Sequence, residues 1–260
     1  MRDNWEWRKQ IGRLAIFDLI KKSRGAVLSW VWLLLKPGIM VFVFWFALSI
    51  GLRIGDDMNP PFFLWLVCGL LPWFYMQEML SGGSDVFHRY SYLVNKIKFP
   101  LSGIPTLFNI SNMFVNITLI LVLLGIYFAH GMPLDSYLLQ VPLILIVMFI
   151  FFNIYATLTS LLSGLSKDFA NLVKAFMTPL FWVSGIFFDV SKVNIEWIQT
   201  VLLFNPVTSF VTAFRDAFYY KTWVWENPSM LGAVGIVFLV TFVVMLILYW
   251  RLHEEVPDAL

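Results

Sequence analysis

The sequence predicts an all-α integral membrane protein with six transmembrane helices, an N-terminal interfacial helix and a re-entrant helical hairpin on the outer face. Three observations lead to this fold class. Hydrophobic residues make up 60% of the 260 residues and charged residues only 13%, whereas soluble domains carry about 25% charged residues. The apolar residues form six runs, each near the ~20 residues that a helix needs to cross the hydrocarbon core. The basic residues collect on one side of these runs. The whole chain, residues 1–260, is therefore read as one transmembrane domain.

The N-terminal segment, residues 1–29, is basic and precedes the first apolar run. Trp7, Ile11 and Leu14 share one helical stripe, and Lys9 falls on the opposite side. This pattern is typical of a helix that lies on the membrane surface, here the cytoplasmic one. The alternative is a basic flank that only sets the topology. No small-residue cleavage site follows a short apolar core, so we expect no cleavable signal peptide.

The six apolar runs are predicted to be helices because irregular backbone cannot face lipid. Five spans occupy residues 31–188, and the sixth is followed by a tail at residues 251–260. With the N-terminus inside, fourteen of the 18 Lys and Arg residues lie on the cytoplasmic side and four outside. Both termini are therefore expected in the cytoplasm. The runs cover residues 31–52, 62–80, 107–128, 138–162, 172–188 and 230–250.

The outer segment, residues 189–229, is too long for a simple turn. It holds two apolar pieces, residues 195–204 and 207–220, which are separated by Asn205 and Pro206. Each piece is too short to span the membrane. A re-entrant hairpin that enters from the outer face fits best. One irregular seventh span is the alternative, but it would place the C-terminus outside and upset the charge distribution.

A polar interruption, residues 80–105, separates the second and third spans. Gly82 and Gly83 are expected to end the second span. The segment between them and Pro100 has apolar residues at mostly helical spacing and a basic opposite side. Such a helix between two spans predicts a docking site for a soluble partner. The apolar residues are Val86, Phe87, Tyr90, Leu93, Val94 and Ile97, and the basic side carries His88, Arg89, Lys96 and Lys98.

Aromatic residues gather on the first and fifth spans. Aromatic faces suit sugar rings, whose C–H faces stack on them, so these residues are candidates for the path of a sugar polymer. Lipid-facing or packing aromatics are the alternative. The candidate path residues are Phe42, Trp45, Phe46, Phe181, Trp182 and Phe188.

Polar residues inside the spans leave several interpretations open. Residues such as Asn and Thr at helical spacing usually join helices by hydrogen bonds, and a polar route is the alternative. Lys36 and Glu78 can pair with each other, or Lys36 can snorkel to the surface. Lys36 can instead bind a lipid diphosphate together with Lys21, Lys22 and Arg24. The two polar stripes are Asn109, Asn112 and Asn116 in the third span, and Asn153, Thr157 and Ser160 in the fourth.

Several motifs of other protein classes are absent from the sequence. There is no GxxxxGK[ST] phosphate loop, and no HExxH, GxSxG or catalytic pair of carboxylates stands out. The one cysteine, Cys68, excludes an internal disulfide and a cysteine metal cluster, and the three histidines are far apart. We therefore expect no enzyme, no metal and no cofactor in this chain. A transport protein of this composition needs energy from elsewhere.

Four stretches of the chain are distinctive in combination: SRGAVLSWVWLLLKP (23–37), GLLPWFYMQEMLSGGSDVFHRYSYLVNKIKFPLSGIP (69–105), LSKDFANLVKAFMTPLFWVSGIFF (165–188) and FNPVTSFVTAFRDAF (204–218). In this order they resemble the membrane subunit of bacterial polysaccharide-exporting ABC transporters. The nearest group is the teichoic-acid translocation permeases, and O-antigen and capsule permeases are related. The similarity spans nearly the whole chain. The first stretch departs from the family pattern, which often has Leu-Gly where Val27-Leu28-Ser29 stands.

The resemblance implies a homodimer in the bacterial cytoplasmic membrane with two separate ATPase subunits, which bind the ATP and Mg²⁺. It implies coupling helices at residues 84–98 and 166–171. The substrate would be a polysaccharide or teichoic acid on undecaprenyl diphosphate, moved from the inner to the outer leaflet; nucleic acid is not an expected partner. The expected coupling residues are Phe87, Arg89, Tyr90, Leu93, Lys167 and Asp168.

Three other functions are weighed against this one. An ABC exporter subunit for a small lipid or a drug would use the same machinery. A membrane glycosyl- or acyltransferase would need a clustered catalytic acid or histidine on a loop at the membrane edge, which the sequence does not offer. A scaffold subunit without transport activity would tolerate loss of the aromatic residues.

Overall fold

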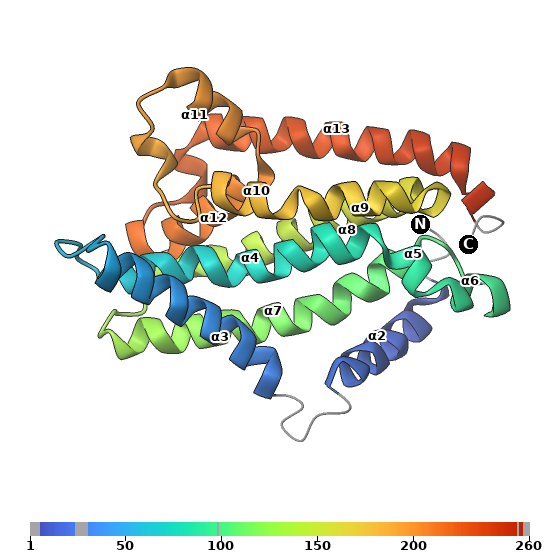
Figure 1. Ribbon diagram of the computed structural model, residues 1–260, viewed down its shortest axis with the longest axis horizontal. Helices are drawn as coiled ribbons and strands as arrows, with labels where there is room; N and C mark the ends of the chain where they lie inside the picture. Colours follow the sequence, from blue (N-terminus) through green and yellow to red (C-terminus); the bar gives the residue numbers. More distant parts are fainter. Residues whose placement is uncertain (1–5, 24–30, 98, 254, 257–260) are drawn as a thin grey trace.

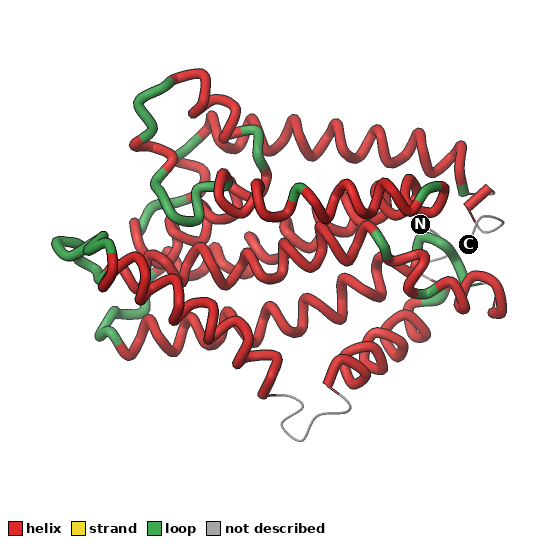
Figure 2. Tube along the Cα trace, in the orientation of Figure 1, coloured by secondary structure: helices red, strands yellow, loops and turns green. Residues whose placement is uncertain are grey.

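The computed structural model describes residues 6–23, 31–97, 99–253 and 255–256, and within them every regular element is a helix. The longer elements run roughly along the long axis of the molecule (Figure 1). Figure 2 shows that the loops lie mainly at its two ends. The α-helices are α2 (Arg8–Ser23), α3 (Val31–Trp45), α4 (Phe62–Ser84), α5 (Val86–Arg89), α6 (Ser91–Ile97), α7 (Gly103–Ala129), α8 (Val141–Leu165), α9 (Lys167–Ala175), α10 (Met177–Val183), α11 (Glu196–Leu203), α12 (Pro206–Arg215) and α13 (Pro228–Leu252).

Five helical stretches among the described residues are long and apolar enough to cross a membrane. Two of them are extended by short non-α turns: α3 continues through a π-helical turn (Phe46–Gly51), and a 3₁₀ turn (Ser136–Gln140) precedes α8. The prediction of an all-α membrane protein is confirmed. The five stretches are Val31–Gly51, Phe62–Ser84, Gly103–Ala129, Ser136–Leu165 and Pro228–Leu252.

The predicted fifth span, residues 172–188, is not one continuous helix. The chain forms α9 and α10, which follow one another in line and are separated at Phe176 (Figures 1 and 2). Pro179 accounts for the break, because its ring clashes with the carbonyl four residues earlier and it has no N–H to donate. Helix α10 then ends at Ser184 and Gly185, where the positive φ of 71° suits a glycine after a helix.

The outer segment contains α11 and α12, which meet at an angle of 89°. Asn205 caps α12 by accepting a hydrogen bond from the Val207 N–H at 3.0 Å, and Pro206 takes the first helical position. Helix α10 ends and α13 begins at the same end of the molecule (Figure 1). The segment with α11 and α12 therefore starts and finishes at the same end of the molecule, as the predicted hairpin requires.

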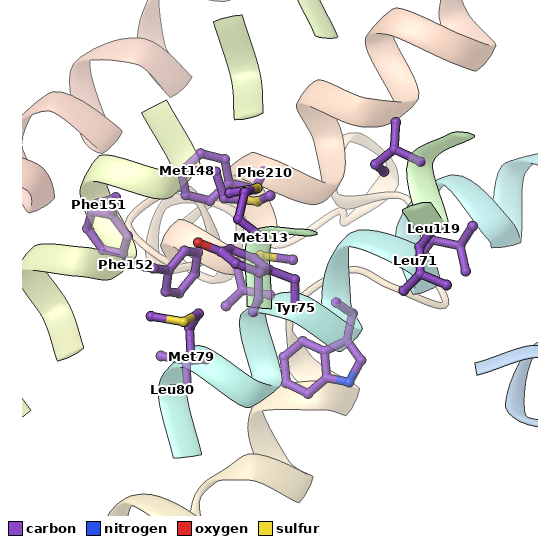
Figure 3. Close-up of a cluster of buried hydrophobic side chains, with 14 of the residues drawn as sticks. Leu71, Tyr75, Met79, Leu80, Met113, Leu119, Met148, Phe151, Phe152 and Phe210 are labelled. Carbon is purple, nitrogen blue, oxygen red and sulfur yellow. The ribbon is translucent and has the colours of Figure 1, made fainter. Parts of the chain in front are cut away.

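Helix α4 forms the centre of the fold and is buried along most of its length. It packs against α7, α8 and α12. Figure 3 shows the resulting cluster, in which Tyr75 and Met79 lie with Met113, Phe152 and Phe210. In contrast, α3 and α13 are mostly exposed.

Glycines allow close packing inside α4 and do not end it, which corrects the expected boundary of the second span. Helix α4 continues through Gly82 and Gly83 to Ser84. A Cβ atom at Gly83 would lie 2.9 Å from the Cβ of Ala156 on α8, and one at Gly82 would lie 2.8 Å from the Phe108 ring on α7. Small residues at such points let membrane helices approach closely.

Only part of the predicted polar stripes joins helices. Asn109 does so, because its amide donates to the Phe149 carbonyl at 2.9 Å and accepts from the Tyr75 hydroxyl at 2.6 Å. On α8 the hydroxyls of Thr157 and Ser160 instead bond to carbonyls of their own helix. Helical spacing predicts a shared face but does not reveal whether a neighbouring helix brings a partner.

Candidate functional site

A cavity of about 380 Å³ is lined by residues of α2, α3, α4, α5 and α7. We call it the cationic cavity. Its wall combines three cations with one carboxylate and two amides, so it is suited to an anionic ligand that also offers hydrogen-bonding groups. The charged and amide residues in the wall are Lys22, Lys36, Glu78, Arg89, Asn112 and Asn116, and Tyr75 also lines it.

Lys22 is held in the wall by contacts from α2 itself and from α7. Its Nζ atom donates to the Asn112 Oδ1 at 2.6 Å and to the Ser111 Oγ at 3.1 Å. It also lies 3.3 Å from the Asp18 carboxylate one turn earlier. Asp18 accepts further hydrogen bonds from the hydroxyls of Ser111 and Tyr90. The network therefore joins α2 to α7 and to the segment before α6.

Burial and charge act in opposite directions on this pair. Burial raises the pKa of the Asp18 carboxyl, but the Lys22 ammonium and the two hydroxyls lower it more, so the pKa lies below its ordinary value. Burial also lowers the pKa of Lys22, and the nearby Asp18 and Glu78 carboxylates only partly oppose this. Asp18 thus serves mainly to compensate the partly buried charge of Lys22.

Arg89 and Glu78 form the second charged pair of the cavity, with 3.6 Å between Nη1 and Oε1. The Arg89 guanidinium also lies 5.1 Å from the centre of the Phe108 ring. Glu78 therefore pairs with Arg89 and not with Lys36, which was one of the alternatives. Within the part of the chain that the structure describes, Lys36 makes no ion pair, so its charge is available to a ligand.

Two of the predicted diphosphate-binding cations lie in this cavity, of the three that the structure describes. Lys22 and Lys36 line it, whereas Lys21 is exposed on α2 outside its wall. Arg24 lies outside the described residues. Sequence reasoning assigned Arg89 to partner docking and so missed it as a wall residue; for Asn116 it favoured helix joining and kept a polar route as the alternative. The regular spacing of the asparagines on α7 was the available signal.

The predicted docking stripe faces inward. Phe87, Tyr90 and Leu93 are buried within the chain, which corrects the expectation of an apolar face presented to a partner. The exposed residues of the segment include Arg89 and Tyr92. The stripe is covered because α5 packs on α7 and α8 at the end of the helical bundle. It therefore anchors the segment to the membrane domain.

Polar contacts fasten the same segment to α8 and α9. The Asp85 carboxylate pairs with Lys174 at 3.0 Å, and the His88 ring nitrogen lies 2.7 Å from the Ser163 carbonyl oxygen. Lys167 and Asp168 are exposed in the first turn of α9, which covers the expected coupling helix at residues 166–171 and continues to Ala175. The Ser166 hydroxyl caps this turn, and the helix runs on through the predicted coupling residues.

The two predicted aromatic sets lie on different parts of the described chain: one on α3 and the π-helical turn after it, the other on and just after α10. Phe42 and Phe46 are exposed, and Trp45 packs on Phe63 with 6.0 Å between ring centres. On α10, Phe181 is packed and Trp182 is 52% exposed. Phe44, which the sequence did not single out, contacts Phe181 with ring centres 5.4 Å apart and so connects α3 to α10. Phe188 is half-buried.

Arg215 joins several segments at the end of the molecule opposite to α5 and α6 (Figure 1). Its guanidinium is buried, donates to the carbonyls of Gly185 and Ile186 at 2.6 Å each, and stacks 3.4 Å from the Trp65 ring centre. These contacts tie α12 to the loop after α10 and to α4. The side chain thus has a structural role and leaves the cationic cavity as the candidate site. Among the described residues, no cluster of His, Cys, Asp or Glu is suited to a metal ion.

Comparison with known proteins extends these observations. The profile of a family described as "ABC-2 type transporter" matches residues 9–219. An O-antigen export system permease protein RfbA from Myxococcus xanthus is 25% identical over 244 residues, which cover 92% of each chain. Two proteins of the same description from Klebsiella pneumoniae are 25% identical over 230 and 233 residues, with 85% of each relative covered.

Proposed function

Because the chain belongs to the ABC-2 type transporter family, we propose that it is the permease subunit of an exporter for a polysaccharide or teichoic acid linked to undecaprenyl diphosphate. It moves this substrate from the inner to the outer leaflet of the bacterial cytoplasmic membrane. A membrane permease of this family is not itself an enzyme. The energy comes from two partner ATPase subunits, which bind the ATP and Mg²⁺. The full-length similarity to O-antigen export permeases supports a polysaccharide as the cargo.

The cationic cavity is the observation that carries the proposal. A glycan cannot cross lipid unaided, since each hydroxyl that loses its hydrogen bonds in hydrocarbon costs several kcal/mol. It needs a protein route, and its diphosphate needs cations where that route begins. Lys36 supplies a cation that makes no ion pair with any described residue, and Lys22 and Arg89 line the same wall. The lipid tail stays in the bilayer throughout.

The proposed assembly contains two copies of this chain and two ATPase subunits. Large parts of α3 and α13 are exposed in the single chain and are free to face a second copy or lipid. The ATPases dock at the end that carries α5 and α6, where Arg89, Tyr92, Lys167 and Asp168 are exposed. That end is cytoplasmic in this proposal, together with both termini.

Replacing Lys36 by Gln tests the function directly. The variant is co-expressed with the partner ATPase, reconstituted in liposomes and assayed for ATP hydrolysis with added undecaprenyl-diphosphate-linked glycan. Loss of one charge-assisted contact is worth about 1.5–3 kcal/mol, so the glycolipid concentration for half-maximal stimulation is expected to rise at least tenfold. Lys21→Gln removes an exposed charge from the neighbouring helix and is the matched control.

Two results would contradict the proposal. If the glycolipid does not change the rate of ATP hydrolysis by the wild-type complex, this would argue against a polysaccharide exporter. An equal loss in both variants would assign the effect to general surface charge and not to the cavity. Stimulation by small lipids or drugs alone would favour the alternative exporter class.

A further inference from the structure

Asn116 lines the cationic cavity and carries a buried acceptor that has no donor among the described residues. The residue is fully buried, and its Oδ1 atom has no hydrogen-bond partner within the described part of the chain. Its amide nitrogen makes one weak contact, 3.7 Å from the Met113 sulfur. A buried acceptor without a donor costs about 1–3 kcal/mol, so such a group in a cavity wall points to a ligand that supplies the donor.

The two other asparagines of the same stripe show that this is not a general property of α7. Asn109 is saturated by Tyr75 and by the Phe149 carbonyl. Asn112 accepts from Lys22 at 2.6 Å and donates to the Phe108 carbonyl at 3.0 Å. Asn116 lies one helical turn further into the bundle, roughly 6 Å along the axis. It lines the same cavity as the cations, and its Oδ1 atom has no donor among the described residues.

The wall thus selects for two chemical groups at once. Lys22, Lys36 and Arg89 suit an anion, whereas an amide oxygen needs an O–H or N–H donor, which an ionised phosphate does not carry. The donor must therefore belong to a group attached to the phosphate. A sugar joined to a diphosphate carries hydroxyl donors, and a bare lipid phosphate carries none.

We propose that Asn116 is a specificity-determining residue that accepts a hydrogen bond from a hydroxyl or amide of the sugar attached to the lipid diphosphate. The cavity then distinguishes a glycosylated lipid diphosphate from the unglycosylated carrier that remains after the glycan is removed. This inference rests on the proposed function and adds a selectivity to it. Carrier without glycan would be poorly retained and would not start a futile transport cycle.

The test compares two lipids on the intact complex of permease and ATPase in phosphatidylcholine nanodiscs. The probes are undecaprenyl diphosphate and undecaprenyl diphosphate N-acetylglucosamine, and their dissociation constants are measured by competition in native mass spectrometry. Wild-type complex is expected to bind the sugar-bearing lipid about fivefold to tenfold more tightly, as one buried hydrogen bond implies. Asn116→Leu should bring this ratio close to one.

Two further variants separate recognition from structure. Asn153 on α8 also has a buried Oδ1 without a partner among the described residues, but it does not line the cavity. Asn153→Leu should therefore leave the ratio unchanged. Asn116→Asp keeps the acceptor; its charge weakens both lipids, but the ratio should persist.

The outcomes separate this inference from the proposed function. If wild-type complex binds both lipids equally, or if Asn116→Leu keeps the wild-type ratio, the sugar contact is wrong while the exporter proposal stands. If phosphatidylglycerol, which carries hydroxyls on a phosphate, competes as well as the sugar-bearing lipid, the site binds a bilayer lipid and the inference fails. If wild-type complex binds neither undecaprenyl lipid, the proposed function itself fails. Poor assembly of Asn116→Leu leaves the wild-type ratio and the Asn116→Asp ratio to decide.

Discussion

Gly83 sets the distance between α4 and α8. The helices approach so closely that a Cβ atom at this position would lie 2.9 Å from the Ala156 Cβ, closer than packed side chains allow. The contact lies next to Ser84, whose carbonyl accepts a hydrogen bond from the Ser163 hydroxyl on α8. A single hydrogen atom as side chain thus permits both the packing and the polar contact.

Gly83→Ala is expected to lower stability. Overpacking of a well-packed interface costs about 1–3 kcal/mol, which outweighs the gain in helix propensity from Gly to Ala of up to about 1 kcal/mol. The thermal midpoint of the purified permease, followed by size-exclusion chromatography after heating, should fall by several degrees. Gly125→Ala on α7 is the control, because nothing lies within 4 Å of its added Cβ. If the thermal midpoint falls equally in both variants, close packing at Gly83 is not what determines the loss of stability.

Residue types alone revealed part of the candidate site. The positive charge of Lys22 and Lys36 near the first span was enough to predict a role in binding an anion. Arg89 lines the same wall only because α5, which follows α4, packs against α7. The contact between α5 and α7 depends on how helices that are distant in sequence pack together, and the spacing of side chains within α5 does not predict it.

At the scale of elements, side-chain contacts join α2 to the α5–α6 segment, so we expect the two to move together. The Tyr90 hydroxyl donates to Asp18, and Asp18 in turn holds Lys22 in the cavity wall. The apolar side of the segment is buried, as Phe87 and Leu93 show. If an ATPase subunit displaces the α5–α6 segment, the hydrogen bond of Tyr90 would therefore transmit the displacement to α2 and to the cavity.

Tyr90→Phe should uncouple α2 from the α5–α6 segment without removing the segment, since the ring that packs in the core is kept. We expect the complex to assemble and to keep its basal ATP hydrolysis, while stimulation by glycolipid falls roughly tenfold, as expected for loss of a hydrogen bond to a charged group. Tyr92→Phe is the matched control because Tyr92 is exposed on α6. Unchanged stimulation in Tyr90→Phe would show that α2 does not carry the signal.

The elements themselves were predicted well where one apolar run fills one helix, as in α7, α8 and α13. The errors have local and tertiary causes. Pro179 divides the fifth run, and the glycine pair before Ser84 serves packing instead of a turn. The stripe with Phe87 was assigned to a partner because periodicity identifies an apolar face but does not show which neighbour covers it.

At the scale of the whole molecule, the exposed aromatics of the predicted path are divided between two segments, α3 with its π-helical turn and α10. Phe42 and Phe46 on α3 and Trp182 on α10 are each more than half exposed. They form no direct ring contact across the two sets in the described chain, although Phe44 connects the helices that bear them. In the proposed homodimer, the two copies would supply facing aromatic walls that neither copy completes alone.

Trp182→Ala therefore tests the glycan path at this scale. An aromatic contact is worth about 0.5–1.5 kcal/mol, so the export rate in reconstituted liposomes is expected to fall roughly threefold to tenfold. The loss should be larger for long glycans than for short ones, because a long chain occupies the path for more of each transport event. Trp250→Ala removes an equally large side chain that is 79% exposed near the end of α13 and should leave the rate unchanged. The same loss for both variants, or a loss independent of glycan length, would assign Trp182 to lipid contact and remove α10 from the path. A loss confined to Trp182 would place the path along the exposed face of α10, and Phe46→Ala would then ask whether α3 completes it.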